Sequence, residues 1–187
     1  MDFKNDENTG TMEVLQKHSI DTSALQKFME KNVSGFQGDI KIEEFKGGQS
    51  NPTYKITSAS QAYVLRRKPP GKLLKSAHAV DREYKVISAL NQTNVPVPKT
   101  YCLCEDEDII GTPFYIMEYM DGRVLWDPSL ENHSKEESFQ IYASMNSTMA
   151  KLHSIDPYDI GLKDFGKQGN YVGRQVSIWT KQYIDSE

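Results

Sequence analysis

The spacing of apolar residues changes twice within the first 70 positions. From Asp21 they recur at helical intervals as far as Val33, which predicts an amphipathic helix that begins at one of the capping residues at 21–23. After Gly35 apolar and polar residues alternate, as is typical of strands. Turn residues divide this stretch into three predicted strands, at Ile40 to Ile42, Thr53 to Thr57 and Ala62 to Arg66.

The pattern then predicts one more helix and two more strands. The helix covers about 76–91, with Val80, Tyr84, Ile87 and Leu90 on its apolar stripe. The strands cover about 100–104 and 114–120, and the acidic residues at 105–108 form the turn between them. After Asp121-Gly122 only helices are expected, one starting at a capping box and one near 172. The chain is therefore predicted to be α+β, with a polar, flexible tail over residues 1–20, a five-stranded antiparallel sheet plus helix over 21–121, and a helical part over 122–187.

Composition and charge narrow the class of protein. Hydrophobic residues make up 37% and charged residues 26%, which is typical of a globular protein. The net charge of -4 argues against a nucleic-acid partner, and no apolar run is long enough for a membrane span. The N-terminus has no features of a targeting signal, and Cys102 and Cys104 are too few for a disulfide framework or a zinc site. These features favour an intracellular protein.

Glycines interrupt the predicted sheet between the first and second strands. Two of them stand together in Gly47-Gly48-Gln49-Ser50-Asn51. Glycine lets the backbone approach a ligand closely, and backbone amides in such a turn bind phosphate oxygens. An ordinary hairpin turn gives the same pattern, so both interpretations stand on this segment alone.

An inward-facing cation and an inward-facing carboxylate follow on consecutive elements. Alternation along the third strand places Arg66 on the face of Val64 and turns Arg67 to the opposite face. Helical spacing places Glu83 on the apolar stripe of the next helix. Since a buried charge needs a partner, we expect Arg66 and Glu83 to form an ion pair, which is how kinases hold a phosphate-binding cation. The alternative is that Arg66 lies at a frayed strand end and reaches water.

The fifth predicted strand runs into a turn at the boundary with the helical part. A nucleotide base would bond there to the backbone of Glu118, Tyr119 and Met120, with Met117 at the back of its pocket. The periodicity by itself fits an ordinary strand equally well.

In this order the segments resemble the aminoglycoside phosphotransferase and choline kinase-like superfamily. The closest resemblance is to the kinase-like N-terminal domain of acyl-CoA dehydrogenase family members 10 and 11. It covers about residues 22–184, and Arg66 stands where many kinases have lysine. The segments that carry it are 45–53, 63–71, 78–84, 95–98 and 111–118.

The resemblance implies a fold, a reaction and a substrate. The fold is a kinase-like N-lobe followed by the first helices of a C-lobe, with the lobe boundary at Asp121-Gly122. The activity that the resemblance implies is ATP-dependent phosphorylation of a hydroxylated acyl-CoA, coupled to a dehydrogenase in fatty-acid breakdown. The family also suggests a mitochondrial or peroxisomal location, although the chain shows no targeting signal. No FAD site is expected in this part.

The sequence departs from the family pattern at its catalytic end. We find no His-Gly-Asp loop and no later metal-binding Asp, so no catalytic or metal-ligating residue is assigned, and Mg²⁺ is expected only with the rest of the C-lobe. His153-Ser154-Ile155-Asp156 and Asp164-Phe165-Gly166 mimic the missing motifs, but their spacing is wrong. Residues 1–187 are therefore expected not to turn over substrate. Phosphate transfer from ATP that is abolished by substituting Asp156 or Asp164 would contradict this.

Two further readings of the chain remain open. It could be a non-catalytic module that binds a nucleotide or a partner, because an incomplete C-lobe would expose the apolar residues around Met145 and Trp179 to a partner or to aggregation. It could also be a generic α+β domain, in which case Arg66 and Glu83 would lie far apart. The remaining histidines, His18, His78 and His133, are expected to be surface or capping residues.

Overall fold

The computed structural model describes residues 9–47, 50–59, 61–71, 78–167 and 169–186. The chain forms two compact units, of which the first ends at Ser154 and the second covers Ile155–Glu187. The expected lobe boundary at Asp121-Gly122 lies inside the first unit and stays a prediction.

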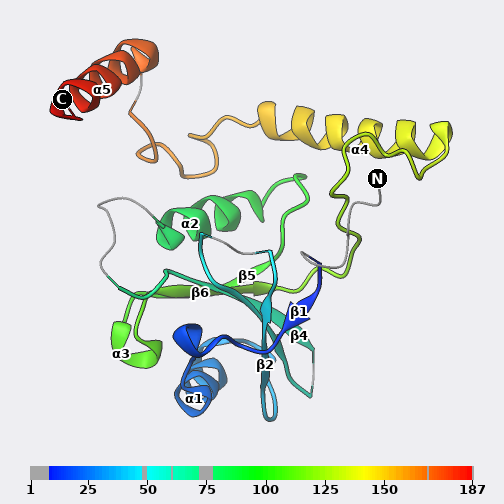
Figure 1. Ribbon diagram of the computed structural model, residues 1–187, viewed down its shortest axis with the longest axis vertical. Coiled ribbons are helices and arrows are strands. Elements are labelled where there is room, and N and C mark those ends of the chain that lie inside the picture. Colours follow the sequence, from blue (N-terminus) through cyan, green and yellow to red (C-terminus); the bar gives the residue numbers. More distant parts are fainter. Residues whose placement is uncertain (1–8, 48–49, 60, 72–77, 168, 187) are drawn as a thin grey trace. The chain divides into compact units, whose positions relative to one another are not determined.

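The first unit is built on an antiparallel sheet with the strand order β1-β2-β3-β4-β6-β5 (Figure 1). The five predicted strands are all present, and β1 pairs with β2 through Thr11 and Phe45. This additional strand lies in the segment expected to be a flexible tail, and it is too short to leave a periodic pattern. The strands are β1 (Thr11–Met12), β2 (Lys41–Phe45), β3 (Thr53–Thr57), β4 (Ala62–Arg67), β5 (Thr100–Cys104) and β6 (Phe114–Glu118).

Two helices begin at the predicted capping residues, whereas the helix predicted over about 76–91 begins only at Val80, after an Ala79 that makes no side-chain capping bond. The Asp21 side chain accepts the N–H of Ala24 at 2.9 Å, and Ser134 and Glu137 form the predicted capping box. The acidic stretch expected to be a plain turn contains one helical turn, which ends at Gly111 with φ of 84°. The helices are α1 (Thr22–Asn32), α2 (Val80–Leu90), α3 (Glu107–Ile110), α4 (Lys135–His153) and α5 (Tyr171–Ser186), with a 3-10 turn, η1, at Gln16–His18.

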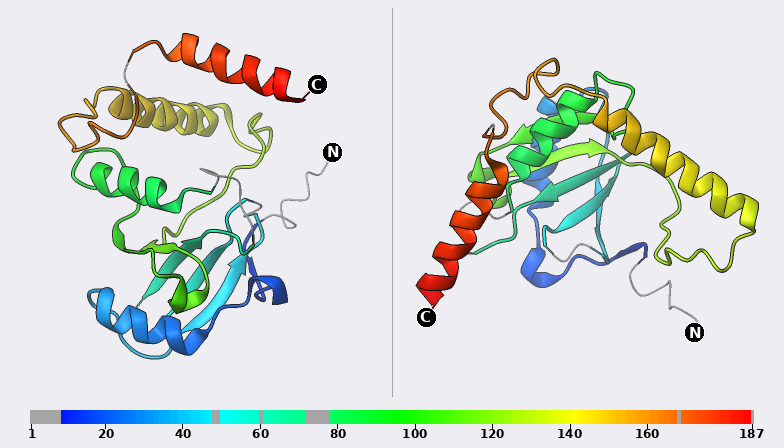
Figure 2. Two further views of the ribbon diagram at one scale, coloured as in Figure 1. Left: turned by 90° about the vertical axis from the view of Figure 1, so that its left-hand side faces the viewer. Right: turned by 90° about the horizontal axis from the view of Figure 1, so that it is seen from above.

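Helices cover both faces of the sheet. Figure 2 shows α1 on one face and α2 on the other. Alternation along each strand sends successive side chains to these two faces. The α1 face carries the main hydrophobic core, in which Leu25 and Met29 of α1 pack among side chains of β3, β4 and β6. The strand residues of this core are Tyr54, Ile56, Tyr63, Leu65, Cys104, Phe114 and Ile116.

Apolar side chains are exposed on both C-terminal helices, each considered by itself. On α4 they include Phe139, Met145 and Met149, which are between 48% and 66% exposed, and on α5 Trp179 is 66% exposed. Within the described residues, no helix is both long and apolar enough to cross a bilayer.

Candidate functional site

Arg66 and Glu83 form the predicted ion pair. Arg66 lies on the α2 face of β4, and its Nε donates to Glu83 Oε2 at 2.7 Å. The two side chains are 29% and 35% exposed, so the pair is accessible from solvent. The reading in which these residues lie far apart is therefore wrong.

Glu83 is the centre of a larger hydrogen-bonded cluster. Its Oε1 accepts from Asn51 Nδ2 at 3.1 Å, and its Oε2 also accepts from the hydroxyl of Tyr115 at 3.2 Å. Arg66 Nη1 donates to Thr53 Oγ1 at 2.9 Å. Burial, followed by the negative charge of Glu83, raises the pKa of Tyr115, so this hydroxyl stays a donor. The two bonds of Arg66 use two of its five guanidinium N–H groups.

His78, two residues before α2, joins this cluster. Its Nδ1 lies 2.7 Å from Asn51 Oδ1. We expected a surface or capping residue here, and a partner 27 positions away leaves no periodic signal in the sequence.

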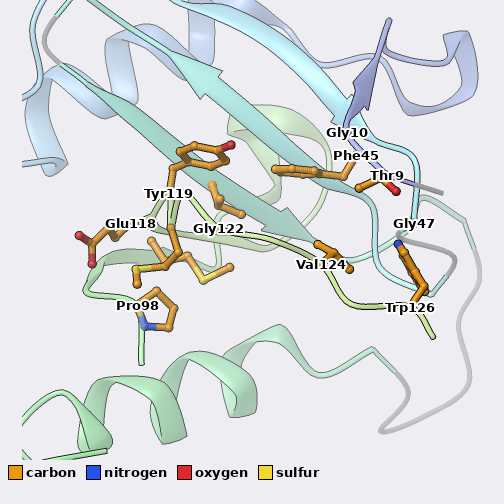
Figure 3. Close-up of a pocket in the computed structure, with 13 residues that line it drawn as sticks. Thr9, Gly10, Phe45, Gly47, Pro98, Glu118, Tyr119, Gly122, Val124 and Trp126 are labelled. Carbon is orange, nitrogen blue, oxygen red and sulfur yellow. The ribbon is translucent and has the colours of Figure 1, made fainter. Parts of the chain in front are cut away.

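Figure 3 shows a pocket of about 460 Å³ whose lining includes residues of β2, β4 and β6. The rings of Phe45 and Tyr119 stack with centroids 6.4 Å apart, and Lys55 Nζ lies 4.3 Å from the centre of the Tyr119 ring. The predicted base-binding strand supplies four of the lining residues. The lining consists of Thr9, Gly10, Phe45, Gly47, Val64, Pro98, Met117, Glu118, Tyr119, Met120, Gly122, Val124 and Trp126.

The pocket and the cluster share one face of the sheet. Val64 lines the pocket, and Arg66 is two residues further along β4 on the same face, a separation of about 7 Å. The predicted glycine turn also reaches both regions, because Gly47 lines the pocket and Asn51 is 3% exposed within the cluster. Ser50 is exposed, and Gly48 and Gln49 lie outside the described residues.

The strand end at the pocket has some of its backbone groups already engaged. The N–H of Glu118 donates to the carbonyl of Lys99 at 2.8 Å, and the Glu118 carboxylate accepts the N–H of Lys99 at 3.1 Å. Figure 3 shows this carboxylate turned away from the pocket. Of the backbone N–H groups at 118–120 that were predicted to meet a base, that of Glu118 is therefore already engaged.

The two cysteines, and His153 and Asp156 of the motif that mimics a kinase loop, have local surroundings of their own. Burial raises the pKa of Cys102 to about 12 and also raises that of Cys104, so both thiols stay protonated. Asp156 accepts the N–H of Tyr158 at 2.8 Å in a local turn, and His153 ends α4. Within the described ranges, no group of three or more His, Cys, Asp or Glu side chains lies close enough to hold a metal ion.

Comparison with known proteins gives a consistent family. Residues 41–187 match the model of the phosphotransferase enzyme family. Probable acyl-CoA dehydrogenase IBR3 of Arabidopsis thaliana is 50% identical, over 90% of this chain and 22% of its own length. Acyl-CoA dehydrogenase family member 11 of Rattus norvegicus is 45% identical, over 92% of this chain and 23% of its own length.

A solved structure agrees with these relatives. A "putative aminoglycoside phosphotransferase" from Ralstonia eutropha JMP134 is 50% identical and superposes with a TM-score of 0.78, over 90% of this chain and 49% of that chain. The chain thus spans less than a quarter of the length of those two curated relatives. The match over residues 41–187 shows that the chain belongs to the phosphotransferase enzyme family.

Proposed function

We propose that this chain is the nucleotide-binding part of an ATP-dependent phosphotransferase. The observation that carries the proposal is the Arg66–Glu83 ion pair, which holds a partly exposed guanidinium about two strand residues from an apolar pocket. An apolar pocket beside a fixed cation suits a ligand that has a flat base at one end and phosphates at the other.

Each part of the site has a separate task in this proposal. Arg66 binds phosphate oxygens with its remaining N–H groups, in the forked geometry that guanidinium offers. Glu83 fixes the direction of the guanidinium, because it accepts from Arg66, Asn51 and Tyr115 together. Of the predicted glycine segment, the described residues Gly47, Ser50 and Asn51 would offer backbone amides to the phosphates.

The base occupies the pocket of Figure 3. Met117 lies at its back, and the backbone between Glu118 and Met120 bonds the base edge. Among the described residues, no group of three or more His, Cys, Asp or Glu side chains lies close enough to hold a metal ion, and no step is assigned to magnesium.

The acceptor in this proposal is a small hydroxylated molecule, and we propose a hydroxyacyl-CoA. The support is the 40–50% identity to proteins named as acyl-CoA dehydrogenases. If this is correct, a hydroxyacyl-CoA raises the melting temperature further when Mg-ATP is already present, whereas an aminoglycoside does not.

Thermal denaturation in the presence of Mg-ATP tests nucleotide binding. A ligand at 100 times its Kd stabilises a protein by about 2.7 kcal/mol, which is a shift of several degrees. We expect this shift in the wild type and its loss in Arg66→Ala. Lys31→Ala, which removes an exposed cation from α1, serves as the control and keeps the shift. A wild type without a shift, or an Arg66→Ala variant that keeps it, would contradict the proposal.

A non-catalytic partner-binding module is the second candidate. The exposed apolar side chains of α4, such as Phe139 and Met145, favour it, because large exposed apolar patches mark interaction surfaces. Association that depends on protein concentration and not on ATP, measured by light scattering, would support this candidate over the first.

A further inference from the structure

We propose that His78 is a positioning residue that holds the phosphate-binding cluster in place through Asn51. This inference rests on the proposed nucleotide site. His78 bonds to Asn51, Asn51 bonds to Glu83, and Glu83 bonds to Arg66, so the effect of His78 on Arg66 passes through Asn51 and Glu83.

The directions of the hydrogen bonds follow from the chemistry of the partners. Glu83, paired with the Arg66 guanidinium, is a carboxylate and only accepts, so the Asn51 atom that faces it is the donor Nδ2. The Asn51 atom that faces His78 is then the acceptor Oδ1, and His78 Nδ1 must carry a proton. The neutral imidazole with its proton on Nδ1 is sufficient for this bond.

Asn51 is also tied to Arg66 by a second route. The Thr53 hydroxyl donates to the backbone carbonyl of Asn51 at 3.0 Å and accepts from Arg66 Nη1 at 2.9 Å. Arg66, Glu83, Asn51 and Thr53 therefore form a closed ring of hydrogen bonds, and His78 holds the Asn51 side chain from outside that ring. Since Asn51 is 3% exposed, water does not readily replace His78 as its donor.

The backbone of His78 has an unusual conformation, in addition to the hydrogen bond of its side chain to Asn51. Its φ is 58°, in the left-handed region that most residues avoid and that Asn, Asp and His enter more readily. It lies two residues before α2, which carries Glu83. This conformation and the hydrogen bond are separable by substitution, which makes the role of each measurable.

Three variants separate the two contributions. His78→Gly permits the positive φ and removes the donor. His78→Asn tolerates the positive φ and carries an amide N–H close to the position of Nδ1. His78→Ala loses the donor and disfavours the backbone conformation. We expect ATP affinity, measured by calorimetry, to fall about fivefold in His78→Gly and to return within about twofold of wild type in His78→Asn. His78→Ala should fall at least as far as the glycine variant, with a lower melting temperature.

A second measurement needs no nucleotide. Hydrogen exchange of the Arg66 Nε–H, followed by NMR on the protein without ligand, reports how firmly Glu83 holds the guanidinium. Exchange should be several times faster in His78→Gly than in wild type, and near the wild-type rate in His78→Asn.

The two measurements distinguish failure of this inference from failure of the proposed function. If the wild type does not bind ATP, the proposed function fails and Arg66 exchange still decides the role of His78. Unchanged exchange in His78→Gly would overturn the positioning role. Equal losses in the glycine and asparagine variants would overturn the relay through Asn51, because the imidazole itself would then be required.

Discussion

Two neighbouring arginines in β4 have opposite surroundings. Arg66 faces α2, is 29% exposed and has a carboxylate as its direct partner. Arg67 faces the α1 side and is 3% exposed, and its Nη1 donates at 3.4 Å to the backbone carbonyls of Ser19 and Ile110. Alternation along one strand thus separates a cation that a ligand can reach from one that is part of the interior.

The α1 face holds a polar cluster of its own. Glu44 is 3% exposed and accepts from His18 Nδ1 at 2.7 Å and from the N–H of Leu15 at 3.1 Å. Tyr54 donates its hydroxyl to the carbonyl of His18 at 2.9 Å. These bonds hold the segment around η1 against β2 and β3. On the α1 face, buried polar groups therefore anchor a chain segment, whereas on the α2 face, in our proposal, they support ligand binding.

Shortening adjacent apolar residues in β4 should give the largest contrast between the faces. Leu65 is fully buried in the core, so Leu65→Ala should lower the free energy of unfolding by about 2–5 kcal/mol. Val64 lines the pocket, so shortening it enlarges an open pocket and does not create a closed cavity. Val64→Ala should therefore lower the free energy of unfolding by less than about 1.5 kcal/mol and should weaken ATP binding. Urea denaturation measures both, and equal losses of stability would remove the distinction between the two faces.

Substituting the two arginines should give opposite results. Arg67→Ala leaves a cavity and removes a donor to two carbonyls, and should cost about 2–4 kcal/mol while keeping the Mg-ATP shift in melting temperature. Arg66→Ala should cost less stability and lose the shift.

The melting temperatures of Arg66→Ala and Arg67→Ala, each measured with and without Mg-ATP, test this prediction. If Arg67→Ala binds no ATP although it is folded by circular dichroism, the buried arginine contributes to the site and the separation is wrong.

The sequence predicts the strands and the Arg66–Glu83 pair because both follow from periodicity. Alternation gives the face of Arg66, and helical spacing gives the face of Glu83. It does not predict the bonds of His78 and His18, which depend on partners 27 and 26 residues away that only the folded sheet brings close. The same holds for β1, because a two-residue strand is defined by its partner and not by its own pattern.

Each face has a buried tyrosine hydroxyl, and their removal should have smaller effects. Burial raises the pKa of Tyr54 to about 12 and also raises that of Tyr115. The folded protein therefore holds these protons more tightly than the unfolded chain, so stability is retained below about pH 10 and falls as the pH rises above it. Tyr54→Phe and Tyr115→Phe should each cost about 1 kcal/mol at pH 7 and reduce the alkaline loss of stability.

The ATP response distinguishes these two variants. Tyr115→Phe removes one donor to Glu83 and should weaken ATP binding, whereas Tyr54→Phe should leave it unchanged. Denaturation between pH 7 and 11 gives the stabilities, and an alkaline loss that persists unchanged in both variants would show that other groups cause it.

The smallest effect is expected for an exposed ion pair on the sheet, Lys41 with Glu43. Their charged atoms are 3.3 Å apart, but the lysine side chain is 72% exposed, so Lys41→Ala should change stability by less than about 0.5 kcal/mol. A double-mutant cycle on this pair and another on Arg66 and Glu83 give the two coupling energies under the same conditions. We expect the second to be larger and less sensitive to salt, because Tyr115 and Asn51 also hold Glu83 in place. Equal coupling energies would mean that the hydrogen-bonded cluster adds nothing to the pairing of two charges, and the fixed cation on which the proposed site depends would lose its structural basis.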